Sequence, residues 1–205
     1  MAIDDFHTNL LFFLRYFHVL FGVIWIGHLY FFNFVNVPLQ AVLEKEVKPK
    51  VNPLLMLRAL WWFRTGAMMT FLIGWLLFFV KYMHEGFYLD QTTNMMSHRT
   101  MWILFGALLG TIMWFNVWMI IWPAQKKLIG WMQAGQTPPE QPATAKRALF
   151  FSRMNTYLSG PLFFTMIAPT HYPSINLVTL IVVLVVGCGT MWGFIRMSYK
   201  VGRTL

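Results

Sequence analysis

The sequence predicts an all-α integral membrane protein, a bundle of about five transmembrane helices that forms one domain over residues 1–205. Of these residues 58% are hydrophobic and only 11% are charged, too few charges to cover the surface of a soluble domain. Apolar stretches of about 20 residues also recur, which is the length of helix that crosses a bilayer core about 30 Å thick.

We expect the five transmembrane helices at 10–36, 61–81, 100–122, 148–168 and 175–199. The first is too long and starts too late for a cleaved signal peptide, and no small-residue cleavage site follows it. Proline should end the first helix before Pro38 and the third at Pro123, and the Gly160-Pro161 pair should kink the fourth.

The basic charge of the chain predicts its orientation. The formal net charge is +9, and with the N-terminus outside and the C-terminus cytoplasmic, every Lys and Arg except Arg15, Lys81 and Arg99 lies at or near the inner surface. Short loops rich in Lys and Arg stay in the cytoplasm. We therefore expect a multi-pass protein of an inner (cytoplasmic) membrane, with the lipid bilayer and not nucleic acid as the partner of its charge.

Two histidines, His18 and His28, lie in the apolar stretch FHVLFGVIWIGHLYFFNF. Ionisable groups inside a membrane are costly and usually functional, and the neutral imidazole is the form that tolerates burial and binds metals. On a helix the two residues are separated by about 15 Å of rise. They would therefore serve different sites or opposite sides of one large group.

His18 is the candidate haem ligand, since histidines on facing walls of helical bundles commonly hold haem iron. Gly22, one turn further along the helix, leaves room for a flat macrocycle. The alternative for His18 is a hydrogen-bonded core histidine. His98 or His171 is the expected second ligand, although His84, a methionine or five-coordinate iron stay open, and Arg15 or Arg99 could pair with the propionates.

A second polar set is expected deeper in the membrane. It comprises His28, Asn33, Arg64, Asn116, Arg153 and Asn155. These residues could bind a haem propionate, a quinone or an anionic substrate, because Arg matches carboxylates. Alternatively the arginines reach the inner interface and the asparagines bond between helices. All Asp and Glu lie in termini or loops, and no residue is assigned a catalytic role.

Three phrases carry a family resemblance: HVLFGVIWIGHLYFFNFVNVP, MWFNVWMIIWPAQKKL and RMNTYLSGPLFFTMIAPTHYP. They resemble the membrane domain of bacterial membrane-bound urate oxidase (urate hydroxylase) and, more distantly, the membrane-bound protoporphyrinogen oxidase. The distant relative has a haem ligand on its first helix, and the resemblance places that role on His18. In the urate-oxidising proteins a c-type cytochrome domain follows the membrane domain. This sequence has no CxxCH, so we expect a separate cytochrome partner.

The leading functional hypothesis is a haem-b redox subunit. It would pass electrons from a membrane or substrate donor to a periplasmic c-type cytochrome or a larger respiratory complex. The alternatives are a non-catalytic assembly subunit of a larger membrane complex, a urate-like purine oxidoreductase, and a copper-handling protein that uses the outer histidines with Met95 and Met96.

Overall fold

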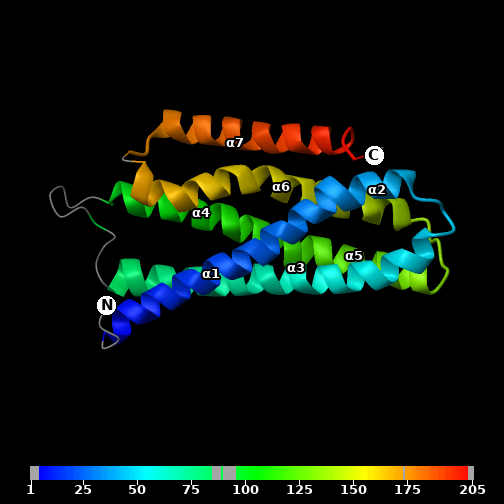
Figure 1. Ribbon diagram of the computed structural model, residues 1–205, viewed down its shortest axis with the longest axis horizontal. Coiled ribbons are helices and arrows are strands. Elements are labelled where there is room, and N and C mark those ends of the chain that lie inside the picture. Colours follow the sequence, from blue (N-terminus) through cyan, green and yellow to red (C-terminus); the bar gives the residue numbers. More distant parts are fainter. Residues whose placement is uncertain (1–4, 85–88, 90–95, 173, 203–205) are drawn as a thin grey trace.

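The computed structural model describes residues 5–84, 89, 96–172 and 174–202, and within them the chain is a bundle of long helices (Figure 1). The elements are α1 (Phe6–Tyr30), η1 (Phe31–Asn36), α2 (Val37–Val42), α3 (Lys48–Phe78), η2 (Phe79–His84), α4 (His98–Phe115), η3 (Asn116–Ile121), α5 (Trp122–Gln133), α6 (Gln141–His171) and α7 (Leu177–Ser198). The all-α prediction is confirmed. We call the end of the bundle at which α1 begins the outer end.

Four stretches are long and apolar enough to cross a membrane, as judged from length and composition. They are Phe6–Val42, Lys48–Met83, His98–Gln133 and Leu177–Ser198. The fourth predicted helix, at 148–168, is present as α6, which has 31 residues but does not reach the apolarity of these four stretches. The chain is a multi-pass membrane protein.

The first four predicted helices extend past their predicted ends, because hydropathy marks only the segment in lipid, whereas α7 lies within its predicted range. Pro38 and Pro123 were expected to end helices, yet α2 and α5 begin around them. Each proline follows a π-helical segment, η1 or η3. Proline has no N–H to donate and its ring clashes with the carbonyl four residues earlier. The wider π turn accommodates both effects, so the helix continues.

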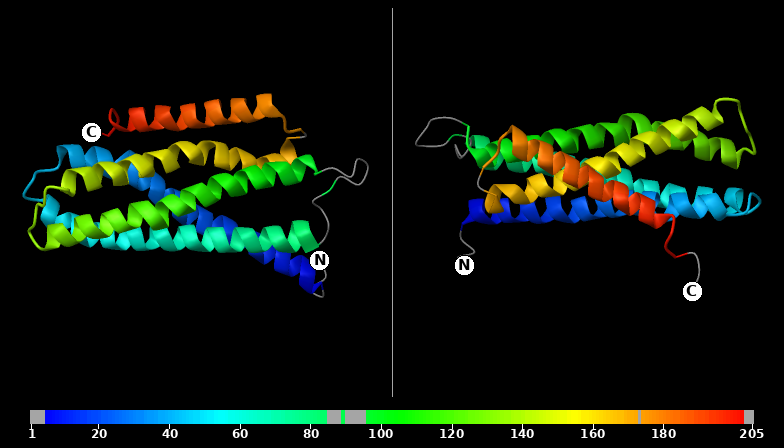
Figure 2. Two further views of the ribbon diagram at one scale, coloured as in Figure 1. Left: turned by 180° about the vertical axis from the view of Figure 1, so that it is seen from behind. Right: turned by 90° about the horizontal axis from the view of Figure 1, so that it is seen from above.

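α1 packs along α3, and α6 packs between α4 and α7. The main core lies where α1, α3 and the segment η3 meet, around Leu29, Phe63, Met113 and Val117, none of which exceeds 1% exposure. α6 and α7 approach at glycines: a Cβ on Gly160 would lie 2.3 Å from the carbonyl oxygen of Gly187. Figure 2 shows α7 lying against α6 at the edge of the bundle.

Candidate functional site

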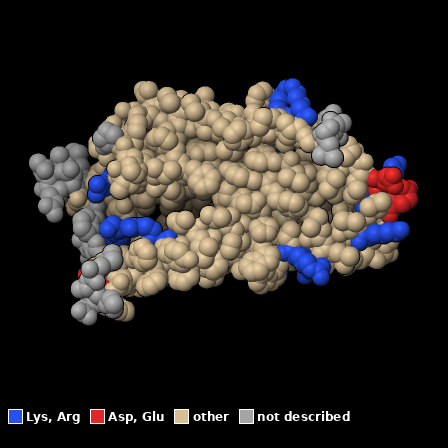
Figure 3. Space-filling model, in the orientation of Figure 1, with Lys and Arg blue, Asp and Glu red and all other residues tan. Residues whose placement is uncertain are grey.

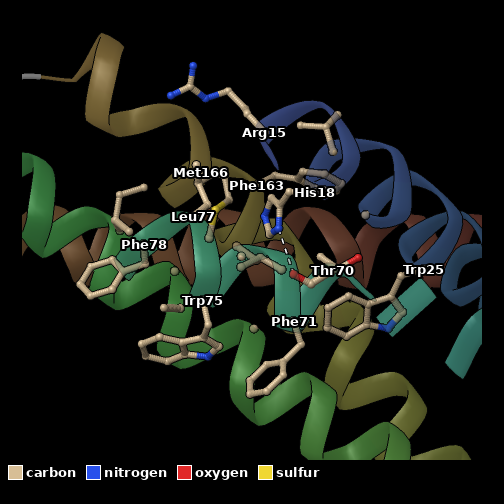
Figure 4. Close-up of a pocket in the computed structure, with 18 of the residues that line it drawn as sticks. Arg15, His18, Trp25, Thr70, Phe71, Trp75, Leu77, Phe78, Phe163 and Met166 are labelled. Atoms are coloured by element: carbon tan, nitrogen blue, oxygen red, sulfur yellow. Dashed lines mark hydrogen bonds between the residues drawn. The ribbon is translucent and has the colours of Figure 1, made fainter. Parts of the chain in front are cut away.

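His18 faces α3 across the helix interface (Figure 4). Its Nδ1 lies 2.9 Å from the backbone carbonyl oxygen of Thr70. Because a carbonyl oxygen can only accept, Nδ1 carries the proton in the neutral ring, and Nε2 keeps its lone pair. Among the described residues, no hydrogen-bond partner lies at Nε2. A histidine held at Nδ1 by a backbone carbonyl, with Nε2 open, has the arrangement of a metal-ligating imidazole.

Gly74 makes the space for this ring. A Cβ at Gly74 would lie 2.7 Å from Cε1 of His18 and 2.9 Å from Nδ1, closer than real Cβ contacts. Gly66, Thr70 and Gly74 follow one another at intervals of four residues, so they form a small-residue stripe on one face of α3. A Cβ at Gly66 would likewise lie 3.0 Å from the backbone nitrogen of Trp25. The stripe lets α1 approach α3 and positions the imidazole.

His18 lines a cavity of about 460 Å³ between α1, α3, α4 and α6. That volume lies within the range of small-molecule and cofactor sites. The lining is apolar and aromatic, with Phe71, Trp75 and Phe78 on α3. A methyl group at Gly22 or Gly110 would meet nothing closer than 3.9 Å. The cavity therefore has room for a flat, apolar group beside the open nitrogen of His18.

The basic side chains of the cavity, Arg15 and Lys81, lie at its outer end together with Tyr82. Both Arg15 and Arg99 act electrostatically on the Tyr82 hydroxyl. None of the described residues that line the cavity is Asp or Glu. The outer end therefore suits an anionic group. Arg15 lines the cavity and Arg99 does not, and the propionate role of both stays a prediction.

The predicted second ligands do not line this cavity. Nδ1 of His98 accepts a hydrogen bond from the backbone N–H of Ile175 at 3.3 Å, and His171 is exposed in the last turn of α6. The side chain of His84 and residue Met95 lie outside the described residues. No group of three or more His, Cys, Asp or Glu converges among the residues that the structure describes. Met166, whose thioether can bind haem iron, does line the cavity.

The deeper polar set does not converge on one cavity. Asn116 Nδ2 donates to Asn155 Oδ1 at 2.7 Å, and Asn155 Nδ2 donates to the carbonyl oxygen of Met113 at 2.9 Å. Both asparagines are buried. These contacts match the alternative in which the asparagines form hydrogen bonds between helices. Asn33 donates to Ser152 on α6 at 2.9 Å.

The arginines and the histidine of the deeper polar set also contact groups within the bundle. Arg64 stacks on the ring of Trp122 at 3.9 Å, and Arg153 donates to the Tyr199 hydroxyl at 2.6 Å. Nδ1 of His28 contacts the carbonyl oxygen of Ile24 on its own helix at 2.7 Å.

A second cleft, of about 450 Å³, lies at the inner end. None of its described lining residues is charged. Its polar lining consists of side-chain amides, those of Asn36, Gln40, Asn52, Gln125 and Gln141. Gln40 and Asn52 exchange two hydrogen bonds, at 2.8 and 2.9 Å. Sequence reasoning missed this cleft, because its amides come from four separate segments that are all polar for other reasons.

Fold and site together define a multi-pass helical membrane protein with a histidine-bearing cavity in its outer half. A family model described as urate oxidase N-terminal matches residues 87–203, more than half of the chain. The chain belongs to this family. The matched range holds α4 to α7, whereas His18 lies before it. Neither curated proteins nor solved structures gave a match, and the likeness to protoporphyrinogen oxidase stays a prediction.

Proposed function

We propose that the chain is a haem-b-type redox subunit of a urate-oxidase-related membrane system. It would pass electrons from a membrane or substrate donor to an acceptor at the outer side, such as a periplasmic c-type cytochrome. One observation carries the proposal: the imidazole of His18 is fixed at Nδ1 by Thr70, with Nε2 open, beside an apolar cavity. The bacterial inner membrane is the proposed location.

The residues fit a haem in three respects. Nε2 of His18 would bind the iron, the glycines and aromatic rings would surround the macrocycle, and Arg15 with Arg99 would neutralise the propionates. Bound haem supplies one-electron chemistry. The surrounding apolar side chains exclude water, and the carbonyl of Thr70 fixes the ring orientation and tautomer. Met166, whose thioether also lines the cavity, would be a candidate second ligand.

The test is the visible spectrum of protein purified from a membrane. We expect a Soret band that His18→Ala abolishes. His28→Ala is the matched control, since His28 lies on the same helix but bonds only to its own backbone, and it should keep the band. A colourless wild-type protein would reject the haem proposal and favour the assembly-subunit alternative.

The amide-lined cleft favours a second candidate function. Side-chain amides both donate and accept, so they match neutral or weakly charged heterocycles that carry C=O and N–H groups, as purine-like rings do. A urate-like oxidoreductase would bind its substrate there. Equilibrium binding of xanthine and urate tests this: Gln141→Ala should weaken binding, whereas Arg147→Ala, nearby on α6 but outside the cleft, should not.

A further inference from the structure

The side chains that line the His18 cavity differ in exposure according to their helix. Those from α3 and α4 are buried or half-buried. The exposed apolar ones come from α1 and α6: Val19 at 57%, Val23 at 66%, Phe163 at 46%, Met166 at 37% and Ile167 at 57%. The cavity is therefore open on the side between α1 and α6.

The path of the two helices explains the opening. α1 and α6 meet where the Tyr30 hydroxyl lies 2.9 Å from Oγ of Ser159. Beyond that point α1 follows α3 and α6 follows α4, so the two diverge towards the outer end (Figure 1). Figure 3 shows a hollow in this face, next to basic side chains. Val23 and Phe163 belong to apolar helix segments, so the opening faces hydrocarbon rather than water.

The positive charge at the outer end of the cavity indicates which chemical class of ligand would bind there. Arg15 is exposed and lies one turn before His18, with its guanidinium directed away from that ring (Figure 4). None of the described lining residues is Asp or Glu, so these residues provide no carboxylate to balance the positive charge of Arg15. A ligand with an apolar body and an anionic group would place the body beside His18 and the anion at Arg15.

We infer that the His18 cavity takes its ligand sideways from the outer half of the bilayer, through the opening between α1 and α6, with Arg15 holding the anionic group. Haem has this chemistry, because its apolar macrocycle carries two carboxylates. Naming haem as the ligand rests on the proposed function, whereas the lateral opening does not.

The opening is tested first, without haem. In a Cys188→Ser background, a nitroxide is attached at Ala107→Cys, on the α4 wall of the cavity, in lipid bilayers. Lipid-facing and water-facing references are Val185→Cys on α7 and Glu46→Cys in the inner loop. We expect the collision rate of the label with oxygen to approach that at position 185, and its collision rate with a nickel chelate to stay far below that at position 46. A label reached by the chelate, or shielded from oxygen, would overturn the inference.

The route is tested next through the rate at which the haem-free protein in liposomes acquires its Soret band. Val23 and Val185 are both 66% exposed, so Val23→Cys and Val185→Cys, each carrying pyrene maleimide, form a matched pair. Blocking position 23 should slow haem uptake by about tenfold, and blocking position 185 should leave it unchanged. Equal rates would overturn the lateral route. Absence of haem uptake by the unlabelled protein would instead reject the proposed function.

The role of Arg15 is tested with haem and its dimethyl ester, which lacks the carboxylates. Arg15→Gln should weaken haem binding by about two- to fivefold, as expected for an exposed ion pair, and should not change binding of the ester. Arg147→Gln is the control for the loss of one positive charge, because Arg147 lies at the end of α6 that is far from the cavity. An equal effect on both ligands would show that Arg15 does not hold the anionic group.

Discussion

At the residue scale, the site depends on a ring and on the absence of a side chain opposite it. An imidazole in an apolar helix could be recognised from the sequence, since His18 stands out in its surroundings. The hydrogen-bond partner of His18 could not be recognised, because it is the backbone carbonyl of Thr70 and every residue has a backbone carbonyl. Gly74 could have been found only by noticing the four-residue spacing of Gly66, Thr70 and Gly74.

Gly74→Ala should displace the His18 ring, because its Cβ would lie 2.7 Å from Cε1. We expect a loss of about 1–3 kcal/mol in stability, typical of overpacking, and a weaker or shifted Soret band. Gly110→Ala is the control, since the nearest heavy atom to its Cβ is 4.0 Å away. Thermal unfolding in detergent and the pigment content report the two effects. Equal behaviour of the two variants would contradict the packing described for His18.

The cap that Asp5 provides at the start of α1 should depend on pH. Its carboxylate caps the helix by accepting from the backbone N–H groups of His7 and Thr8. Hydrogen bonds from the Thr8 hydroxyl, then from the Thr8 backbone, lower the pKa of Asp5. A lowered pKa means that the cap is fully present above the ordinary Asp value of about 3.9 and is lost as pH falls through the folded-state value.

Hydrogen exchange of the amides in residues 7–9, corrected for intrinsic rates, should therefore accelerate as pH falls below about 4. Asp5→Asn should keep the cap without this pH dependence, because asparagine also caps helices but does not titrate. Asp5→Ala should exchange fast at every pH. A cap that persists in the acid limit would show that the charge of Asp5 is not needed.

At the element scale, hydropathy located the helices but not their ends. Prolines mark helix ends on average, yet here η1 and η3 widen the turn before Pro38 and Pro123. Such π segments leave no clear trace in a single sequence. They also present Asn33 and Asn116 to neighbouring helices. The sequence placed these asparagines in a polar set, whereas the helix contacts separate them into two bonded groups.

The α6–α7 contact predicts the effect of a larger side chain. A Cβ at Gly187 would lie 2.6 Å from the backbone nitrogen of Pro161, and backbone cannot move aside as a flexible side chain can. Gly187→Leu should separate α7 from α6, lower the unfolding temperature and expose the connection between them to protease. Gly193→Leu, on the same helix with nothing within 4 Å, should be tolerated. Equal stability of the two variants would contradict this packing.

At the scale of the whole molecule, the number of membrane crossings depends on α6. Four apolar stretches alone would leave both termini on one side of the membrane, whereas five crossings place them on opposite sides. α6 has 31 residues, about 46 Å at the helical rise, and it lies alongside the other helices (Figure 2). Its low apolarity comes partly from Asn155, Thr156, Ser159 and Thr165, all of which are buried. Helix contacts, and not lipid, surround these polar groups.

We therefore expect α6 to cross the membrane, with the end of α7 on the side opposite to the start of α1, as Figure 1 shows for the bundle. Topology reporters test this: a periplasm-active phosphatase should work when fused before residue 5, and a cytoplasm-active fluorescent protein when fused after residue 202. Cysteine accessibility at Glu46 and Gln136, in the two inner connections, gives an independent check, with both sites labelled only from the cytoplasmic side. Termini on the same side would mean that α6 does not span the bilayer. The cavity wall that α6 provides beside His18 would then have to be assembled differently.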